Sequence, residues 1–192
     1  MSDASAGNEG FFRAPHPLAV ELAALLRAKQ SFVLVLGTGS DRNLPVLRSS
    51  AANVEVVDEG GNPLELPGAS VDAVLSTHGL LHGRCSEIAA RLDELRRVAR
   101  KNAFLYATFG SVRDSRFGEG IKVETNVFAP KAGDEAGVPH AFFDRIGLQR
   151  LLKGFVISNA LEIQVDDIAG AWAHRQTALR GAVHWFVKAR RR

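Results

Sequence analysis

The chain of 192 residues contains one cysteine, Cys85, and no apolar run that approaches about 18 residues. A single cysteine excludes an internal disulfide and suits a reducing compartment. The absence of a long apolar run predicts that no segment spans a membrane. The first residues, MSDASAGNEG, also lack the charged-then-apolar order of a signal peptide. Together these absences predict a cytoplasmic protein.

Metal-binding and nucleic-acid-binding patterns are also lacking. Histidines and tryptophans in the C-terminal third follow no zinc-site spacing, and the cysteine is remote from them, so no metal site is expected. The net charge is only +3, partly because of a basic tail, and no basic stripe rich in aromatic residues is visible. Nucleic acid is therefore an unlikely partner, and a small molecule is favoured. The histidines and tryptophans of the C-terminal third are His140, Trp172, His174, His184 and Trp185, and the tail cations are Lys188, Arg190, Arg191 and Arg192.

The most informative positive feature is the segment 32–41, FVLVLGTGSD. Five apolar residues predict a buried strand, and the glycines that follow predict a tight turn into a helix. Such a turn brings backbone N–H groups and a helix N-terminus to the end of a parallel strand, where nucleotide-like ligands bind. The segment predicts a nucleotide- or cofactor-binding α/β domain.

Strands and helices alternate along the rest of the chain. Residues 1–15 are mostly small and polar and are expected to be disordered, whereas 16–192 are expected to form a single domain. The alternation predicts a doubly wound, mostly parallel sheet with helices on both faces and an antiparallel edge strand. Strands are predicted at 32–36, 53–58, 71–76, 103–109, 155–165 and 182–189, and helices at 17–28, 41–48, 86–99 and 143–152. The segment 110–140 shows little periodicity and is predicted to be a long functional loop.

The ordered series of motifs resembles the class I S-adenosylmethionine-dependent methyltransferases. VLVLGTGSDRNLPVL is similar to the family's first glycine-rich motif, and NVEVVDE to its second strand ending in an acid. LELPGASVDAVLSTHGLLHG, LDELRRVARKNAFLYATFG, FFDRIGLQRLLKGF and GAVHWFVKAR resemble the later strands and helices in order. The resemblance covers 31–190 and implies a Rossmann-like methyltransferase fold with S-adenosyl-L-methionine as cofactor.

The sequence departs from the family pattern in three places. Val35 stands where the family has an acid that helps to hold the methionine end of the cofactor, and Asp41 replaces the third glycine. Little more than a loop separates Asp58 from Asp72, where the family has a helix and a strand. One strand–helix unit is therefore predicted to be missing, leaving about six strands. An edge strand left exposed in this way could pair with a second copy, so a homodimer is possible.

Candidate cofactor-binding residues lie at three predicted strand ends. Gly37, Thr38 and Gly39 would let the chain approach a ligand closely, although a plain turn is the alternative. Asp58 or Glu59 could accept hydrogen bonds from ribose hydroxyls, although a solvated strand end is the alternative. Ser76 and Thr77 close a third strand beside the glycine turn.

Candidate catalytic and substrate-binding residues follow from their positions. His78, next to the crevice, could act as a proton acceptor, although a structural role is equally open. His82, Arg113 and His140 are candidates for substrate contact, with helix capping the alternative for His82 and a surface ion pair the alternative for Arg113. The resemblance places the loop that contains Arg113 over the acceptor pocket.

Three functions remain open from the sequence. The first is methyl transfer from S-adenosylmethionine to a small-molecule acceptor. The second is a non-catalytic methyltransferase-like binding or regulatory module, favoured by Val35 and the missing unit. The third is an NAD-dependent oxidoreductase, disfavoured because Arg42 occupies the position of the last glycine in its fingerprint.

Overall fold

The computed structural model describes residues 14–26, 30–37, 41–51, 53–59, 63–133, 135–166, 168 and 180–192. Of residues 1–15, for which the sequence predicts disorder, 1–13 lie outside the described residues, as do the candidate residues Thr38 and Gly39. No described helix has the length and apolar character needed to cross a membrane.

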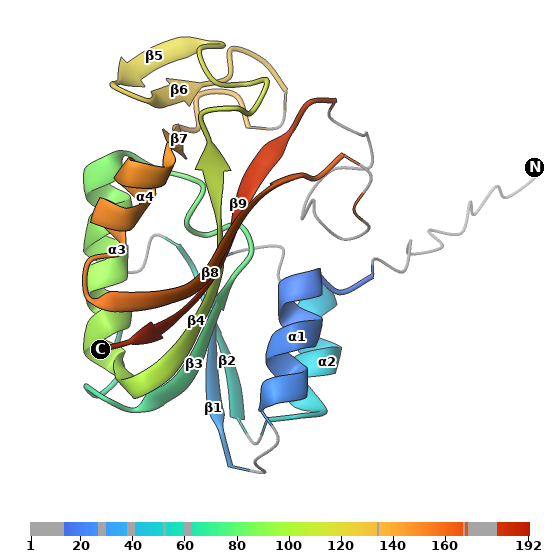
Figure 1. The fold of residues 1–192 in the computed structure, drawn as a ribbon, viewed down its shortest axis with the longest axis vertical. Helices are drawn as coiled ribbons and strands as arrows, with labels where there is room; N and C mark the ends of the chain where they lie inside the picture. The colour runs from blue at the N-terminus through green and yellow to red at the C-terminus, as the bar shows by residue number, and fades with distance from the viewer. Residues whose placement is uncertain are drawn as a thin grey trace, which may run out of the picture.

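A twisted sheet forms the centre of the molecule (Figure 1). Four strands, in the order β2-β1-β3-β4, run parallel; β9 then pairs antiparallel with β4, and β8 pairs antiparallel with β9. The antiparallel strand is thus one place in from the edge, which β8 forms. The bounds are β1 Phe32–Leu36, β2 Asn53–Val57, β3 Val71–Ser76, β4 Ala99–Ser111, β8 Phe155–Gln164 and β9 Val183–Arg191.

Helices cover both faces of this sheet, which confirms the doubly wound α/β prediction (Figure 1). One face packs against α1 (Pro17–Leu25) and α2 (Leu44–Arg48), which follows the short 3-10 helix η1 (Asp41–Asn43). The other face packs against α3 (Cys85–Val98) and α4 (Arg145–Leu151). β1 is a continuous apolar run, and so is β3 from Ala73 to Leu75, as expected for strands that are buried on both faces.

The predicted loss of one strand–helix unit is also confirmed. The chain passes from Val57 at the end of β2 to Val71 at the start of β3, and the described residues between them form neither a helix nor a strand. As a result β2 is an edge strand, and Val56 on it is 40% exposed. Six strands, β2, β1, β3, β4, β9 and β8, correspond to the predicted sheet, and further strands in residues 121–143 extend it from β4 to nine strands among the described residues.

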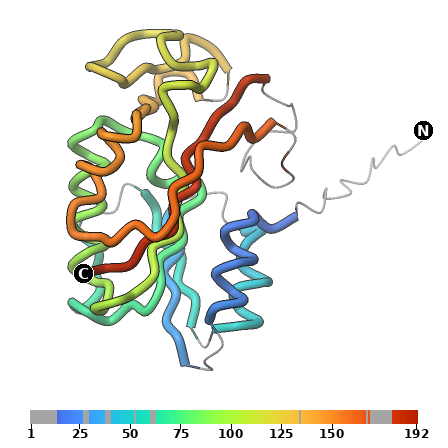
Figure 2. The backbone as a smooth tube through the Cα atoms, viewed as in Figure 1, coloured from blue at the N-terminus to red at the C-terminus, as the bar shows by residue number. Residues whose placement is uncertain are grey.

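The segment predicted to be a long loop is instead a small antiparallel lobe, so that prediction was wrong. Residues 112–143, called the hairpin lobe below, contain β5 (Ile121–Glu124), β6 (Val127–Ala129) and β7 (His140–Phe143). β5 pairs with β6, β6 pairs with β7, and β7 joins the end of β4. Strands of three or four residues are too short to show a period-2 pattern. Figure 2 shows the backbone leaving β4, forming the lobe above the sheet and returning to α4.

Candidate functional site

The carboxyl ends of β1, β2 and β3 form the predicted cofactor edge. Gly37 follows β1 with φ +102, and a Cβ atom there would lie 2.7 Å from the backbone N of Gly79. Its N–H also donates to the Val57 carbonyl at 2.9 Å. Glycine is therefore required at 37 because two turns pack backbone against backbone, whether or not a ligand is bound.

The residues that close β3 are deeply buried. Ser76 and Thr77 are 0% and 1% exposed, and Thr108 Oγ1 donates to the Thr77 carbonyl at 2.5 Å. Asn43 connects this strand end to the first helix. Its Nδ2 donates to Thr77 Oγ1 at 3.4 Å, and its Oδ1 accepts from the His16 backbone N–H at 2.8 Å. The edge is thus a preorganised polar network.

His78, the predicted catalytic residue, is 4% exposed. Burial lowers the pKa of His78 well below its usual value, and the nearby His184 and Arg42 lower it further. A histidine with so low a pKa is neutral at neutral pH but is a weak proton acceptor. The catalytic role of His78 stays a prediction.

The two candidate acids after β2 lie in different surroundings. Asp58 is exposed at the strand end. Glu59 is partly buried, and its Oε1 lies 3.0 Å from Nδ1 of His82. Asp58 is therefore the more exposed of the two acids, whereas Glu59 contacts a histidine, and the cofactor-binding role of both stays a prediction.

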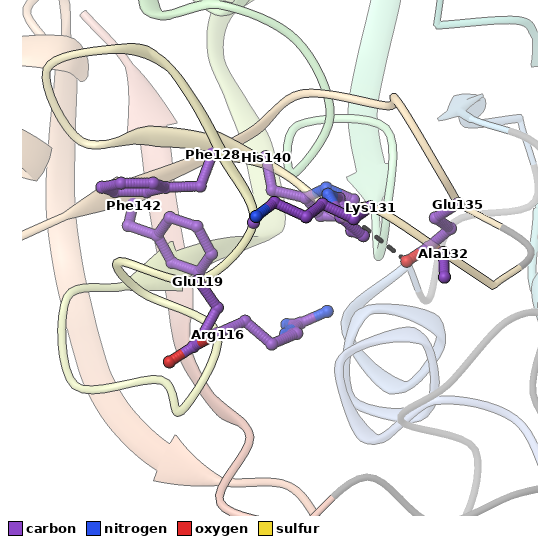
Figure 3. Close-up of a pocket in the computed structure, with 10 residues that line it drawn as sticks. Arg116, Glu119, Phe128, Lys131, Ala132, Glu135, His140 and Phe142 are labelled. Carbon is purple, nitrogen blue, oxygen red and sulfur yellow. Dashed lines mark ion pairs between the residues drawn. The ribbon is translucent and has the colours of Figure 1, made fainter.

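A cavity of about 390 Å³ lies within the hairpin lobe, which supplies all of its described lining residues (Figure 3). Aromatic rings and charged groups share its wall, which is lined by Arg116, Glu119, Phe128, Lys131, Glu135, His140 and Phe142, together with Gly120, Pro130 and Ala132. The rings of Phe128 and Phe142 lie 6.3 Å apart, and each packs edge-on against Phe117. The wall can therefore contact an apolar face and charged substituents of one small molecule.

Arg116 enters the cavity wall because a buried carboxylate fixes it. Asp114 accepts from Arg116 Nε at 2.9 Å and Nη2 at 3.0 Å, and from the Val183 backbone N–H at 2.9 Å. Burial opposes ionisation of Asp114, but the bonds from Arg116 outweigh it and lower the pKa of the carboxyl. Arg113, the predicted substrate residue, instead extends outward, 75% exposed, and pairs with Glu162 Oε2 at 3.0 Å.

The structure brings two predicted substrate residues, His82 and His140, together with Glu135, which the sequence reasoning did not single out. Nε2 of His82 lies 3.5 Å from Glu135 Oε1, and Nε2 of His140 lies 3.2 Å from Glu135 Oε2. Burial works to lower the pKa of His82, but Glu135 and Glu59 outweigh it and raise the pKa to about 9. The histidines in turn hold the pKa of Glu135 well below its usual value. Sequence spacing gave no sign of this cluster, whose atoms could serve as metal ligands.

Comparison with known proteins yields the fold. No protein-family model and no curated protein matches the sequence. A SAM-dependent methyltransferase from Methanosarcina mazei is similar with a TM-score of 0.63 and 12% identity, covering 88% of this chain and 96% of that one. A second similar structure is the Burkholderia thailandensis 1,6-didemethyltoxoflavin-N1-methyltransferase, solved with 1,6-didemethyltoxoflavin and S-adenosylhomocysteine. Its TM-score is 0.61 and its identity 17%, and the match covers 92% of this chain and 79% of that one. This chain has the class I S-adenosylmethionine-dependent methyltransferase fold.

The methyltransferase fold alone does not fix the reaction. The [4+2]-cyclase SpnF also matches, with a TM-score of 0.56, 17% identity, and coverage of 90% of this chain and 80% of that one. Within the methyltransferase fold, Val35 is fully buried in the apolar cluster against α1 and α2. The position where the family has an acid is therefore part of the core here.

Proposed function

We propose that the protein transfers a methyl group from S-adenosyl-L-methionine to a small-molecule acceptor. The cofactor would bind at the carboxyl ends of β1, β2 and β3, and the acceptor in the cavity within the hairpin lobe. The observation that carries the proposal is the joint presence of the methyltransferase fold and, on that side of the sheet, a separate cavity of about 390 Å³. A methyltransferase needs both a cofactor edge and an acceptor site beside it.

The cofactor edge fits S-adenosylmethionine in its donor and acceptor groups. Asp58 is exposed directly after β2, where a carboxylate can accept two hydrogen bonds from a ribose diol. Gly37, Thr38 and Gly39 would cover the cofactor from the turn after β1, and Ser76 and Thr77 would border it at the end of β3. Glu59 would contribute indirectly, since its carboxylate contacts His82.

The acceptor we propose is planar and carries an acidic group. The rings of Phe128 and Phe142 offer faces and edges for a flat apolar body, while Arg116 and Lys131 offer positive charge. Methyl transfer from a sulfonium requires mainly proximity and alignment, which such a wall can provide. His78 would serve as base only for an acceptor that must lose a proton.

Thermal unfolding with and without S-adenosylmethionine and S-adenosylhomocysteine tests the cofactor site. Ligand at about 100 times its dissociation constant stabilises a protein by about 2.7 kcal/mol. For a domain of this size the expected rise in Tm is about 5–10 °C. Asp58→Asn should reduce the rise without changing the Tm of the ligand-free protein, whereas Asp93→Asn, an exposed acid on α3, should leave it unchanged. A screen of planar acids with methyl-labelled cofactor then tests turnover.

A non-catalytic methyltransferase-like module is the second candidate, and Val35 is the observation that favours it. An apolar residue buried in the core cannot replace the acid that holds the methionine end of the cofactor. This candidate predicts no rise in Tm with either ligand. A homodimer through the exposed edge of β2, and a cytoplasmic location, stay predictions under both candidates.

A further inference from the structure

The geometry points to a divalent transition-metal site formed by His82, Glu135 and His140, of which Glu135 and His140 line the cavity within the hairpin lobe. Their ligand atoms all lie within 4.8 Å of one another. Two imidazoles and a carboxylate are a donor set that zinc and first-row ions such as iron(II) and cobalt(II) accept, with positions left open for another ligand.

The backbone places the two histidines side by side. His82 and His140 form an antiparallel bridge, supported by the bonds Gly83 N–H to Pro139 O at 2.7 Å and Ala141 N–H to Leu81 O at 3.2 Å. The imidazole rings lie edge to face with centroids 4.8 Å apart. Residues 58 positions apart in the sequence are therefore fixed by main-chain hydrogen bonds rather than by flexible side chains.

Each imidazole is oriented through its Nδ1 atom, which leaves Nε2 for a metal. Nδ1 of His82 lies 3.0 Å from the Glu59 carboxylate, and Nδ1 of His140 lies 2.8 Å from the Val138 carbonyl. Both Nε2 atoms face the Glu135 carboxylate. Metal-binding histidines are oriented in this way by a carboxylate or a backbone carbonyl on the opposite ring nitrogen.

His140 gives the most specific indication. A carbonyl accepts only, so Nδ1 must donate to Val138 O, and in the neutral ring Nε2 then carries a lone pair. The Nε2 atom is buried and lies 3.2 Å from Glu135 Oε2, without a hydrogen bond of good geometry to a described residue. A lone pair directed at a carboxylate is unfavourable unless a cation or a proton lies between them. A divalent ion between them would bind both His140 Nε2 and the Glu135 carboxylate.

The spacing suits metal bonds. In a tetrahedral site with bonds of about 2.0–2.2 Å, ligand atoms lie about 3.3–3.6 Å apart. Nε2 of His82 lies 3.5 Å from Glu135 Oε1, and Nε2 of His140 lies 3.2 Å from the other oxygen, Oε2. Small adjustments of the Glu135 side chain would therefore admit an ion.

The open position of the ion would face the cavity, because Glu135 and His140 both line it (Figure 3). An oxygen or nitrogen of the acceptor could then bind the metal, which would orient it and favour its deprotonated form. This role rests on the proposed methyl transfer, but metal binding itself does not depend on it. The test therefore begins with metal alone.

Isothermal titration of Zn²⁺ into untagged, chelator-treated protein without S-adenosylmethionine tests the site, and Co²⁺ absorption reports the ligand geometry. We expect one site per chain. Glu135→Gln and His140→Gln should each weaken binding about 100-fold or more, and Glu59→Gln about 10–100-fold through the lost orientation of His82. Glu119→Gln, which changes a carboxylate in the same cavity wall, should bind Zn²⁺ as the unmodified chain does.

The result that would overturn the site is an absence of one-to-one binding in the unmodified chain, or unchanged affinity in both Glu135→Gln and His140→Gln. In that case the cluster is a protonated ion-pair network. Circular dichroism confirms that each variant is folded. Zn²⁺ binding without any response to S-adenosylmethionine would support the site while contradicting the proposed methyl transfer, so the two failures are distinguishable.

Discussion

The parallel sheet and the hairpin lobe meet at the same edge of the molecule but are built differently. In the sheet, a strand such as Phe32–Leu36 is buried on both faces, and its own apolar residues define it. In the lobe, β5 and β6 are four and three residues long, and β7, which pairs with β6, is joined to the rest of the chain by β4 and by the His82–His140 bridge. The sheet provides the predicted cofactor edge, whereas the lobe supplies every described residue that lines the cavity.

The largest effect is expected from a charge in the sheet. Val35→Asp restores the family's acid but places it in a fully buried position, where an unpaired charge should lower the free energy of unfolding by about 4 kcal/mol or more. Val56→Asp is the matched control, since Val56 pairs with Val35 across β1 and β2 and is 40% exposed. It should cost no more than about 1 kcal/mol in urea unfolding. Equal losses would contradict the buried role of Val35.

A smaller loss is expected where the lobe is fastened to the sheet. Asp114→Asn removes the charge that fixes Arg116, while the amide keeps an acceptor for the Val183 N–H, and it should cost about 2–4 kcal/mol in urea unfolding. Because the pKa of Asp114 is lowered by folding, its stabilisation is present above the unfolded pKa near 3.8 and is lost as pH falls through the lower folded value. The free energy of unfolding of Asp114→Asn should therefore lack the part that the original chain loses at low pH. If Arg113→Ala, and not Asp114→Asn, lost this stability at neutral pH, Arg113 rather than the Asp114–Arg116 pair would fasten the lobe to the sheet.

The pH dependence of stability gives a third comparison, through the buried His16 at the start of α1. Burial, with Arg42 and His184 nearby, lowers the pKa of His16 to about 3, so the folded chain keeps His16 neutral while the unfolded chain protonates near 6.5. Stability is therefore lost as pH falls below 6.5. His16→Asn retains an N-cap for α1 without this proton. Between pH 7 and 5.5 the original chain should lose about 1 kcal/mol more than the variant in urea unfolding. Parallel losses would contradict a neutral buried His16.

The smallest effect is expected on the outer surface of the lobe. Arg113→Ala removes an exposed ion pair with Glu162 and should change the free energy of unfolding by less than about 1 kcal/mol. It should also leave turnover of any acceptor unchanged, whereas Arg116→Ala should impair it. Impaired turnover in Arg113→Ala alone would support the original sequence prediction for that residue.

Much of the sheet could be predicted because its information is local. The strands 32–36 and 71–76 agree with β1 and β3 to the residue, and the helix predicted at 86–99 lies one residue from α3. The missing strand–helix unit could be predicted because the segment between Asp58 and Asp72 is too short to contain it. The cavity could not be predicted, because Glu135 lies in a segment without periodicity and His82 meets His140 only through tertiary pairing. Candidate side chains were identifiable by type, but their convergence and the outward direction of Arg113 were not.

Isothermal titration of S-adenosylhomocysteine into the purified chain tests the central claim most directly. The account predicts one site per chain, with affinity reduced in Asp58→Asn and unchanged in Asp93→Asn. The absence of binding, or equal binding by both variants, would contradict a cofactor site at the carboxyl ends of β1, β2 and β3.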